Sequence, residues 1–146
     1  MKAHRFALSV SATPTAVADA RHRAVDAIEG WDTVLCIELV HTAELVISEF
    51  LTNAVRHAEA DPVSLSVRLD EQSLRIEVCD DCPELPRPGL PDPCSESGRG
   101  LFLVAALTDR YGVEPTAVGK CCWAEIALPT DPDHLIVSPL VAQRSC

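Results

Sequence analysis

The stretch EFLTNAVRH, residues 49–57, places a polar stripe within an otherwise apolar segment of the chain. Glu49, Asn53 and His57 follow one another at intervals of four residues, so a helix would place all three on one face. A carboxylate and an amide oxygen one turn apart are suited to a hard cation or an activated water, which is the chemistry of a magnesium-bound phosphate. The alternative is a surface helix whose polar stripe simply faces water.

Length and charge narrow the classes of protein to consider. The 146 residues fit one domain with one sizeable core, and an apolar content of 47% is that of a globular chain. The formal net charge is −10 and the sequence has no cluster of Lys and Arg, which argues against binding to nucleic acid. No apolar run approaches the roughly 20 residues of a membrane span. Residues 6–10 alternate like a strand and are too short for a signal peptide, so we expect a cytoplasmic protein.

The cysteines number seven, and they are Cys36, Cys79, Cys82, Cys94, Cys121, Cys122 and Cys146. Their odd number and irregular spacing make a disulfide framework improbable. A zinc site built from Cys79 and Cys82 with the pair at 121–122 is an alternative. However, structural zinc sites use two well-spaced pairs, and adjacent cysteines point to opposite faces of a strand. We therefore expect buried, small apolar thiols.

Periodicity predicts the order of the secondary-structure elements. The expected elements are a strand at 4–10, a helix from Thr13-Pro14 to Gly30, a helix from His41 to about Ala58, strands at 63–69 and 74–78 joined as a hairpin, a helix from Leu101, and strands at 110–114 and 120–128. Residues 31–40 could form a short helix or a turn. The proline-rich segment 81–99 is typical of a lid, a binding loop or disorder.

This order predicts an α+β fold. We expect a two-layer sandwich in which a mixed, mainly antiparallel sheet packs helices on one side only. Residues 1–129 would form the domain and residues 130–146 a C-terminal tail.

Two further segments have the composition of binding sites. Asp80 ends a strand, where a lone aspartate is more often a turn residue. Gly98-Arg99-Gly100 stands where a helix is expected to begin, and backbone amides at such a position can approach a phosphate closely. Glycine at a helix start is a weak signal by itself, because it also serves in ordinary turns.

Taken together, these segments resemble the GHKL ATPase superfamily of gyrase, histidine kinase and MutL ATPase domains. Residues 49–57 resemble its N box, 76–83 its first glycine box, 98–101 its second, and 119–126 its closing strand. The resemblance extends from about residue 14 to residue 128. It is strongest to the small, stand-alone anti-sigma factor serine/threonine kinases that are abundant in actinobacteria, and it implies the Bergerat ATP-binding fold.

The resemblance implies ATP and Mg²⁺ as cofactors and assigns a role to each matching residue. Glu49 would be the general base that takes a proton from a serine hydroxyl or from water. Asn53 would ligate the Mg²⁺ that bridges the ATP phosphates, and Asp80 would accept a hydrogen bond from the adenine amino group. Residues 84–97 would form the lid. The remaining residues of the nucleotide site would be His57, for which a packing role is equally compatible, and Cys82, Gly98, Arg99, Gly100, Leu101 and Cys121.

The sequence departs from the family pattern in three places. Cys82 and Glu84 replace glycines of the first box, Cys121 replaces a threonine that helps to bind adenine, and the lid is rich in proline. A thiol is a poorer hydrogen-bonding group than a hydroxyl. These changes bear on the strength of ATP binding more than on the fold.

Two functions follow from this comparison. The first is an ATP-dependent protein kinase that phosphorylates a Ser or Thr of a STAS-type anti-sigma antagonist, sequesters a sigma factor, or does both. The second is a non-catalytic adaptor on the same fold, either nucleotide-sensing or independent of nucleotide. A homodimer through the first helix is compatible with either function.

Overall fold

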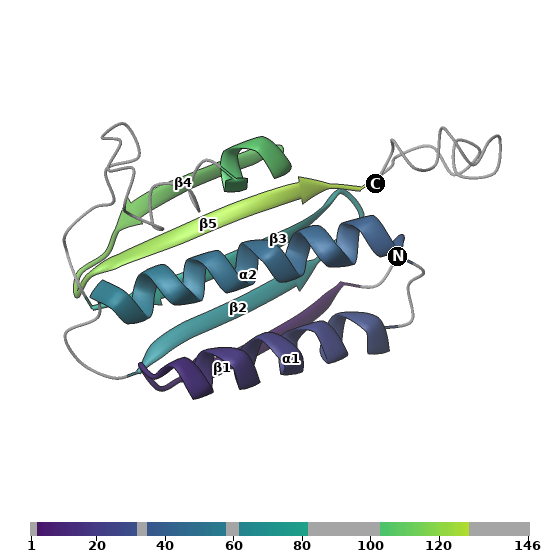
Figure 1. Ribbon diagram of the computed structural model, residues 1–146. Helices are drawn as coiled ribbons and strands as arrows, with labels where there is room; N and C mark the ends of the chain where they lie inside the picture. Colours follow the sequence, from purple (N-terminus) through teal and green to yellow (C-terminus); the bar gives the residue numbers. More distant parts are fainter. Residues whose placement is uncertain (1–2, 32–34, 58–61, 82–102, 129–146) are drawn as a thin grey trace, which may run out of the picture.

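The computed structural model describes residues 3–31, 35–57, 62–81 and 103–128. Within these residues, two long helices and five strands form two layers (Figure 1). In chain order the elements are β1 (His4–Val10), α1 (Pro14–Gly30), α2 (Ile37–His57), β2 (Val63–Leu69), β3 (Ser73–Asp80), β4 (Arg110–Pro115) and β5 (Lys120–Ala127). Residues 103–107 are also helical. The predicted α+β sandwich is confirmed.

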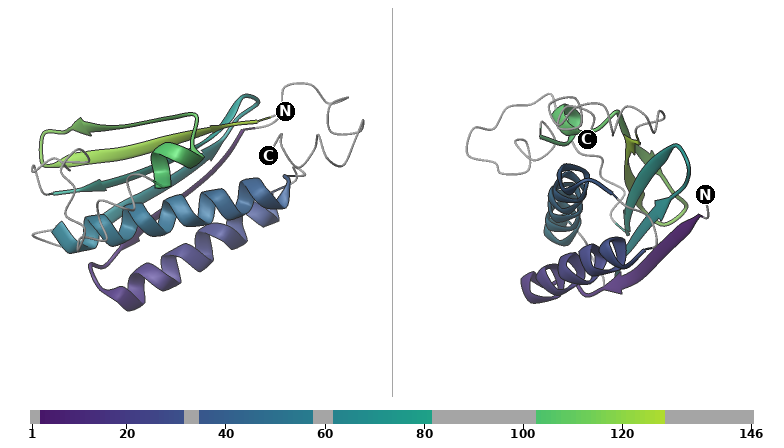
Figure 2. Two further views of the ribbon diagram at one scale, coloured as in Figure 1. Left: turned by 45° about the horizontal axis from the view of Figure 1, so that its top comes forward. Right: turned by 90° about the vertical axis from the view of Figure 1, so that its right-hand side faces the viewer.

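The five strands form one sheet in the order β1-β2-β3-β5-β4, and every pairing is antiparallel. Both long helices lie against the same face of this sheet (Figure 2). Burial alternates along β2 and β3, as a sheet with one covered face requires. Buried apolar side chains of the covered face include Val63, Leu65, Val67, Leu69, Leu74, Ile76, Val78, Cys122 and Ala124.

Helix α1 has the boundaries that the sequence predicts. The Thr13 hydroxyl oxygen accepts a hydrogen bond from the backbone N–H of Ala16 at 3.1 Å, and Pro14 occupies the first turn. The residues that α1 buries recur every three or four positions, and they are Val17, Ala20, Ala24 and Ile28. Sequence-local capping therefore determines where this helix begins.

Helix α2 begins four residues earlier than the predicted start at His41. Leu39 and Ala43 lie one turn apart and are both buried in the core, so burial extends the helix toward its N-terminus. Glu38 in the first turn favours this start, because a negative charge is stabilised at a helix N-terminus. The predicted lid at 84–97 and the tail at 130–146 lie outside the described residues. In the described part of the chain, no helix has the length and apolar character needed to span a membrane.

The turn between β2 and β3 is closed by a side chain. The Asp70 Oδ1 atom accepts hydrogen bonds from the backbone N–H groups of Gln72 at 2.8 Å and Ser73 at 2.9 Å. These two hydrogen bonds, together with the nearby Arg68, hold the pKa of Asp70 below its ordinary value. The ionised carboxylate therefore stabilises the hairpin.

We predict that Asp70→Ala lowers the free energy of unfolding by about 1 kcal/mol at neutral pH, because it removes two hydrogen bonds to the turn. The loss is small because the carboxylate is solvent-exposed. Because the folded-state pKa is depressed, this contribution is present above the unfolded-state pKa and is lost as the pH falls through the folded-state value. The difference between wild type and variant should thus shrink below pH 3.8. Urea unfolding at several pH values measures it, and a difference that stays constant into acid would contradict the assignment.

Candidate functional site

The polar stripe of α2 is partly enclosed by the fold. Asn53 is only 8% exposed, and Glu49 lies half-buried one turn earlier on the same helix. Their neighbours Phe50 and Ala54 belong to the core, and α2 packs on β3 and β5. The Asn53 amide makes no hydrogen bond to another described residue. Every fully buried polar side-chain atom among the described residues has a hydrogen-bond partner. Since the Asn53 amide has none, it is not fully buried and still reaches solvent. The amide is thus more enclosed than a residue on an ordinary surface stripe.

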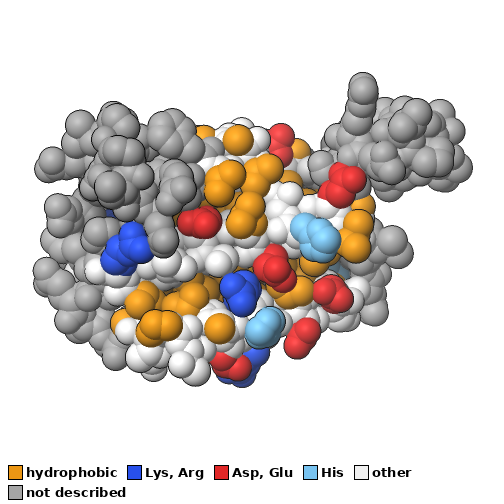
Figure 3. Space-filling view, viewed as in Figure 1, with side chains coloured by type: hydrophobic (Ala, Val, Ile, Leu, Met, Phe, Trp, Pro, Cys, Tyr) orange, Lys and Arg blue, Asp and Glu red, His pale blue; other side chains and the backbone are white. Residues whose placement is uncertain are grey.

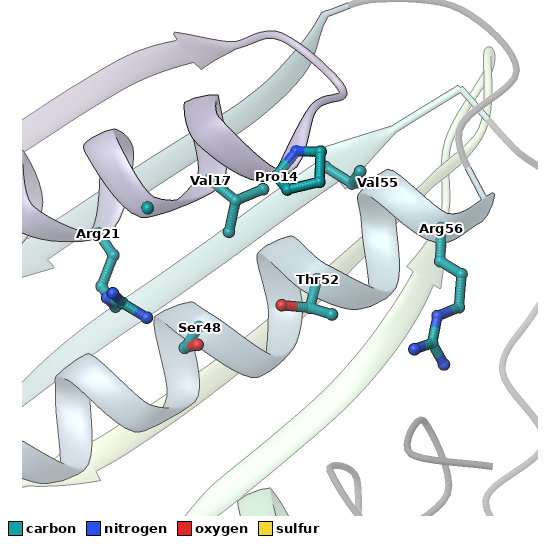
Figure 4. Close-up of a pocket in the computed structure, with 8 residues that line it drawn as sticks. Pro14, Val17, Arg21, Ser48, Thr52, Val55 and Arg56 are labelled. Carbon is teal, nitrogen blue, oxygen red and sulfur yellow. The ribbon is translucent and has the colours of Figure 1, made fainter.

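Another side of α2 borders a different hollow. A groove of about 370 Å³ lies between α1 and α2 (Figure 4). Its lining residues are Pro14, Val17, Ala18, Arg21, Ser48, Thr52, Val55 and Arg56. Thr52 directly precedes Asn53, and successive helix residues are rotated by roughly 100°. Asn53 is not among the residues that line this groove, so the groove is separate from the predicted nucleotide site.

The buried end of β3 carries the second predicted contact. Asp80 lies opposite Lys120 in the β3–β5 register, and the Lys120 Nζ donates a hydrogen bond to Asp80 Oδ1 at 3.2 Å. The two side chains are 2% and 1% exposed, so they form a buried ion pair. Sequence reasoning missed Lys120. The signal was present, because Lys120 falls in phase with Cys122 and Ala124, the core-facing positions of β5.

This ion pair is compatible with a bound adenine. A carboxylate offers about four acceptor positions, so one ammonium group does not occupy all of them. Lys120 holds the Asp80 carboxylate in one orientation, and carboxylate oxygens are acceptors of the kind that a purine amino group needs. The described residues therefore include the types of group that a nucleotide site needs. These are a carboxylate acceptor at the end of β3 and an amide oxygen on α2.

A glycine determines how closely β5 approaches Asp80. A Cβ atom at Gly119 would overlap the Asp80 carbonyl oxygen and lie 2.6 Å from the Asp81 Cα. The turn before β5 is held by Thr116, whose hydroxyl oxygen accepts a hydrogen bond from the Gly119 N–H at 2.9 Å. The absence of a side chain at Gly119 thus allows Lys120 to reach Asp80.

The cysteines depart from the prediction of free thiols. Cys79 and Cys121 are opposite one another across β3 and β5, with Cα atoms 4.0 Å apart, and they form a disulfide. The prediction was wrong for this pair because strand register, not sequence spacing, brings the two residues together. It was also wrong for Cys36, which is disulfide-bonded. Cys122 is a buried free thiol, as predicted, and burial raises its pKa to about 11. At neutral pH it is therefore protonated and unreactive.

The structure brings together some of the expected site residues and separates others. Glu49 and Asn53 share one side of α2, and Asp80 lies at the end of β3 on the sheet face that α2 covers. Cys121 lies on the opposite face of the sheet, bonded to Cys79, while Lys120 is the residue beside Asp80. The expected contacts that lie outside the description are the side chain of His57 and the residues Cys82, Gly98, Arg99, Gly100 and Leu101.

Comparison with known families agrees with this arrangement. The histidine kinase-like ATPase domain family matches residues 10–126, which is most of the chain and includes α2, β3 and β5. The chain belongs to this family. No curated protein matches it in sequence.

Two solved structures share the histidine kinase-like ATPase fold. The crystal structure of the RsbU and RsbW domains of Rv1364c from Mycobacterium tuberculosis aligns with 86% of this chain and 33% of that chain, at 18% identity and a TM-score of 0.63. The histidine kinase domain of the blue-light activated kinase EL346 from Erythrobacter litoralis aligns with 77% of this chain and 59% of that chain, at 23% identity and a TM-score of 0.50. The chain thus spans about a third of the first protein's aligned chain. At these identities the likeness concerns the fold.

The close approach at Gly119 generates one prediction for this ATPase fold. Gly119→Ala should lower the free energy of unfolding by about 1–3 kcal/mol, because the new Cβ must push β5 away from Asp80. Gly30→Ala is the matched control. No atom lies within 4 Å of its Cβ position, so it should be neutral or stabilising by up to about 1 kcal/mol. Chemical denaturation compares the two, and equal midpoints would contradict the close approach.

The buried ion pair generates another prediction. Lys120→Met should lower the free energy of unfolding by about 3–5 kcal/mol, since it leaves the Asp80 carboxylate buried without its cation. Adding Asp80→Asn should recover much of the loss, because the remaining group is then uncharged. A double-mutant cycle in urea measures the coupling. Additive effects of the two substitutions would show that the residues do not interact.

Proposed function

We propose that this protein is an ATP-binding regulator that transfers the γ-phosphate of ATP to a Ser or Thr of a partner protein. The proposal rests mainly on Asn53, which is nearly buried but reaches solvent one turn after Glu49. The buried Asp80 at the end of β3 supports a purine contact on the covered face of the same sheet. Membership of the histidine kinase-like ATPase family supports the same reading.

The expected partner is a STAS-type anti-sigma antagonist, a sigma factor, or both. The likeness to a structure that contains an RsbW domain supports this type of regulator. It also agrees with the sequence resemblance to stand-alone anti-sigma factor kinases. That this protein contacts such a partner is itself part of the proposal.

Each of the described site residues would have its own role in the reaction. Asn53 would supply an uncharged oxygen to Mg²⁺, which suits a site in which phosphates provide most of the negative charge. Bound ATP would supply the phosphoryl group, and its Mg²⁺ ion would neutralise part of the negative charge on that group. Glu49 would take the proton from the attacking serine oxygen. Asp80, oriented by Lys120, would accept a hydrogen bond from the adenine amino group.

A second function is favoured by one observation. The Lys120 ammonium is already bound to Asp80, and it competes with an adenine amino group for the same carboxylate. Cys121, which stands in the place of a threonine in the family pattern, is on the other face of the sheet. A non-catalytic adaptor, which binds its partner with or without nucleotide, would not need the adenine contact.

We expect calorimetric titration of Mg·ATP to show saturable binding to the wild type. Asn53→Ala should weaken binding about tenfold or more, because it removes the oxygen that would ligate the magnesium ion. Thr52→Ala is the matched control, since Thr52 lines the separate groove between α1 and α2. Failure of the wild type to bind at millimolar nucleotide would exclude the kinase and favour the nucleotide-independent adaptor.

The same proteins separate binding from transfer. Glu49→Gln should bind Mg·ATP like the wild type, yet lower the rate of phosphate transfer to a STAS-type antagonist by about 10²–10⁴, the range expected for loss of a general base. Radiolabelled ATP measures the transfer. Nucleotide binding without transfer by the wild type would favour the nucleotide-sensing adaptor.

A further inference from the structure

Four arginines lie in one row across the sheet face opposite the helices. The cross-strand pairs are Arg5 with Arg68, Arg68 with Arg75, Arg75 with Glu125, and Glu125 with Arg110. The row therefore crosses all five strands in their spatial order. The two long helices lie against the other face of the sheet (Figure 2). We call the four arginines, Arg5, Arg68, Arg75 and Arg110, the arginine row.

The arginine row concentrates positive charge in an acidic protein. The chain has a formal net charge of −10, yet four of the eight Lys and Arg residues that the structure describes belong to this row. Neighbouring strands are about 4.8 Å apart, so the row spans about 19 Å from β1 to β4. The helical face differs, because acidic, basic and hydrophobic side chains are interspersed there (Figure 3).

One half of the row is held in place by its neighbours. Glu125 accepts a hydrogen bond from Arg75 at 2.8 Å and pairs with Arg110 at 3.3 Å, while Glu77 pairs with Arg75 at 3.3 Å. The guanidinium carbons of Arg75 and Arg110 lie 4.5 and 5.7 Å from the centre of the Trp123 ring. Partial burial opposes the charge on Arg75, but these carboxylates outweigh it and raise its pKa. Both guanidinium groups are thus charged and held beside an aromatic ring.

The other half of the row has no such partners. Arg5 and Arg68 are exposed, and neither makes an ion pair or a hydrogen bond with another described residue through its side chain, although the Asp70 carboxylate is near enough to Arg68 to interact with it electrostatically. Like charges directly opposite on adjacent strands destabilise a sheet, so this pair costs free energy in the isolated protein. A bound anion would relieve that repulsion.

The strip beside the row has small residues at three of its five positions. The adjacent cross-strand row consists of Ala7, Ser66, Glu77, Trp123 and Gly112. The Trp123 ring lies so close over Gly112 that a Cβ atom there would be 2.9 Å from it. Small residues at the β1, β2 and β4 positions leave a shallow surface on which a rod-shaped segment could rest.

We propose that the arginine row docks an acidic helix of a partner protein, lying across the strands. Carboxylates on one side of a helix recur about every 5.4 Å, close to the strand spacing of about 4.8 Å, so three successive turns meet the arginines of β1, β2 and β3. Arg binds carboxylates in a planar, bidentate geometry. A second copy stacked row against row would oppose like charges, and the net charge of −10 disfavours nucleic acid. The surface lies on the other face of the sheet from Asn53, so the proposal stands independently of nucleotide binding.

A designed peptide tests the proposal. The probe is a fluorescent, alanine-rich helical peptide with Glu at every fourth position, and its control carries Gln instead. Anisotropy should show that the wild type binds the Glu peptide and that Arg5→Glu/Arg68→Glu weakens binding at least tenfold. Arg21→Glu/Arg23→Glu on α1 makes the same change in net charge and should leave binding within twofold. Amide NMR shifts should map to Ser66 and Gly112.

Three outcomes would overturn the proposal. The first is equal binding of the peptide by the two double variants, and the second is tighter binding of a duplex DNA through the same arginines. The third is a wild-type dimer in sedimentation that Arg5→Glu/Arg68→Glu dissociates, which would assign the face to a second copy. Arg5→Gln/Arg68→Gln removes the charges without reversing them, and it replaces the first variant if that one fails to fold. Mg·ATP titration of these variants should match the wild type, which separates this test from that of the kinase.

Discussion

The pairing of β3 with β5 is the constraint on which the rest of the structure depends. Its register extends from Ser73 opposite Ala127 to Asp80 opposite Lys120. Because side chains alternate between faces, a slip of one residue would exchange the core set for the exposed set along the whole strand. The register that buries Ile76 against α2 therefore also places Asp80 beside Lys120 and the disulfide on the open face.

The buried ion pair at the end of this ladder serves stability and binding in opposite ways. An ammonium and a carboxylate removed from water must satisfy each other, and losing either partner costs more than the pair contributes. Lys120 therefore holds Asp80 in position even without ligand. The same contact makes the lysine a competitor for any purine that uses Asp80.

The two faces of the sheet differ in charge for a simple structural reason. The helical layer covers the apolar face and leaves the other face for polar side chains, so the arginines of four strands gather there. In an acidic chain, such a concentration creates a local field that the net charge does not reveal. It also means that excluding clustered cations from the sequence alone does not exclude a basic surface on the folded protein.

By itself, the sequence determined the elements whose signals are local. The Thr13-Pro14 cap and the alternation of β2 and β3 predicted those elements closely, and the four-residue spacing predicted that Glu49 and Asn53 share one side of a helix. Only the tertiary structure decided the early start of α2, the strand order, the Asp80–Lys120 pair, the Cys79–Cys121 bond and the arginine row. Each of these features either joins segments that are distant along the chain or follows from burial against such segments. Periodicity fixes which face a side chain takes, whereas its neighbour across the sheet is fixed by strand register.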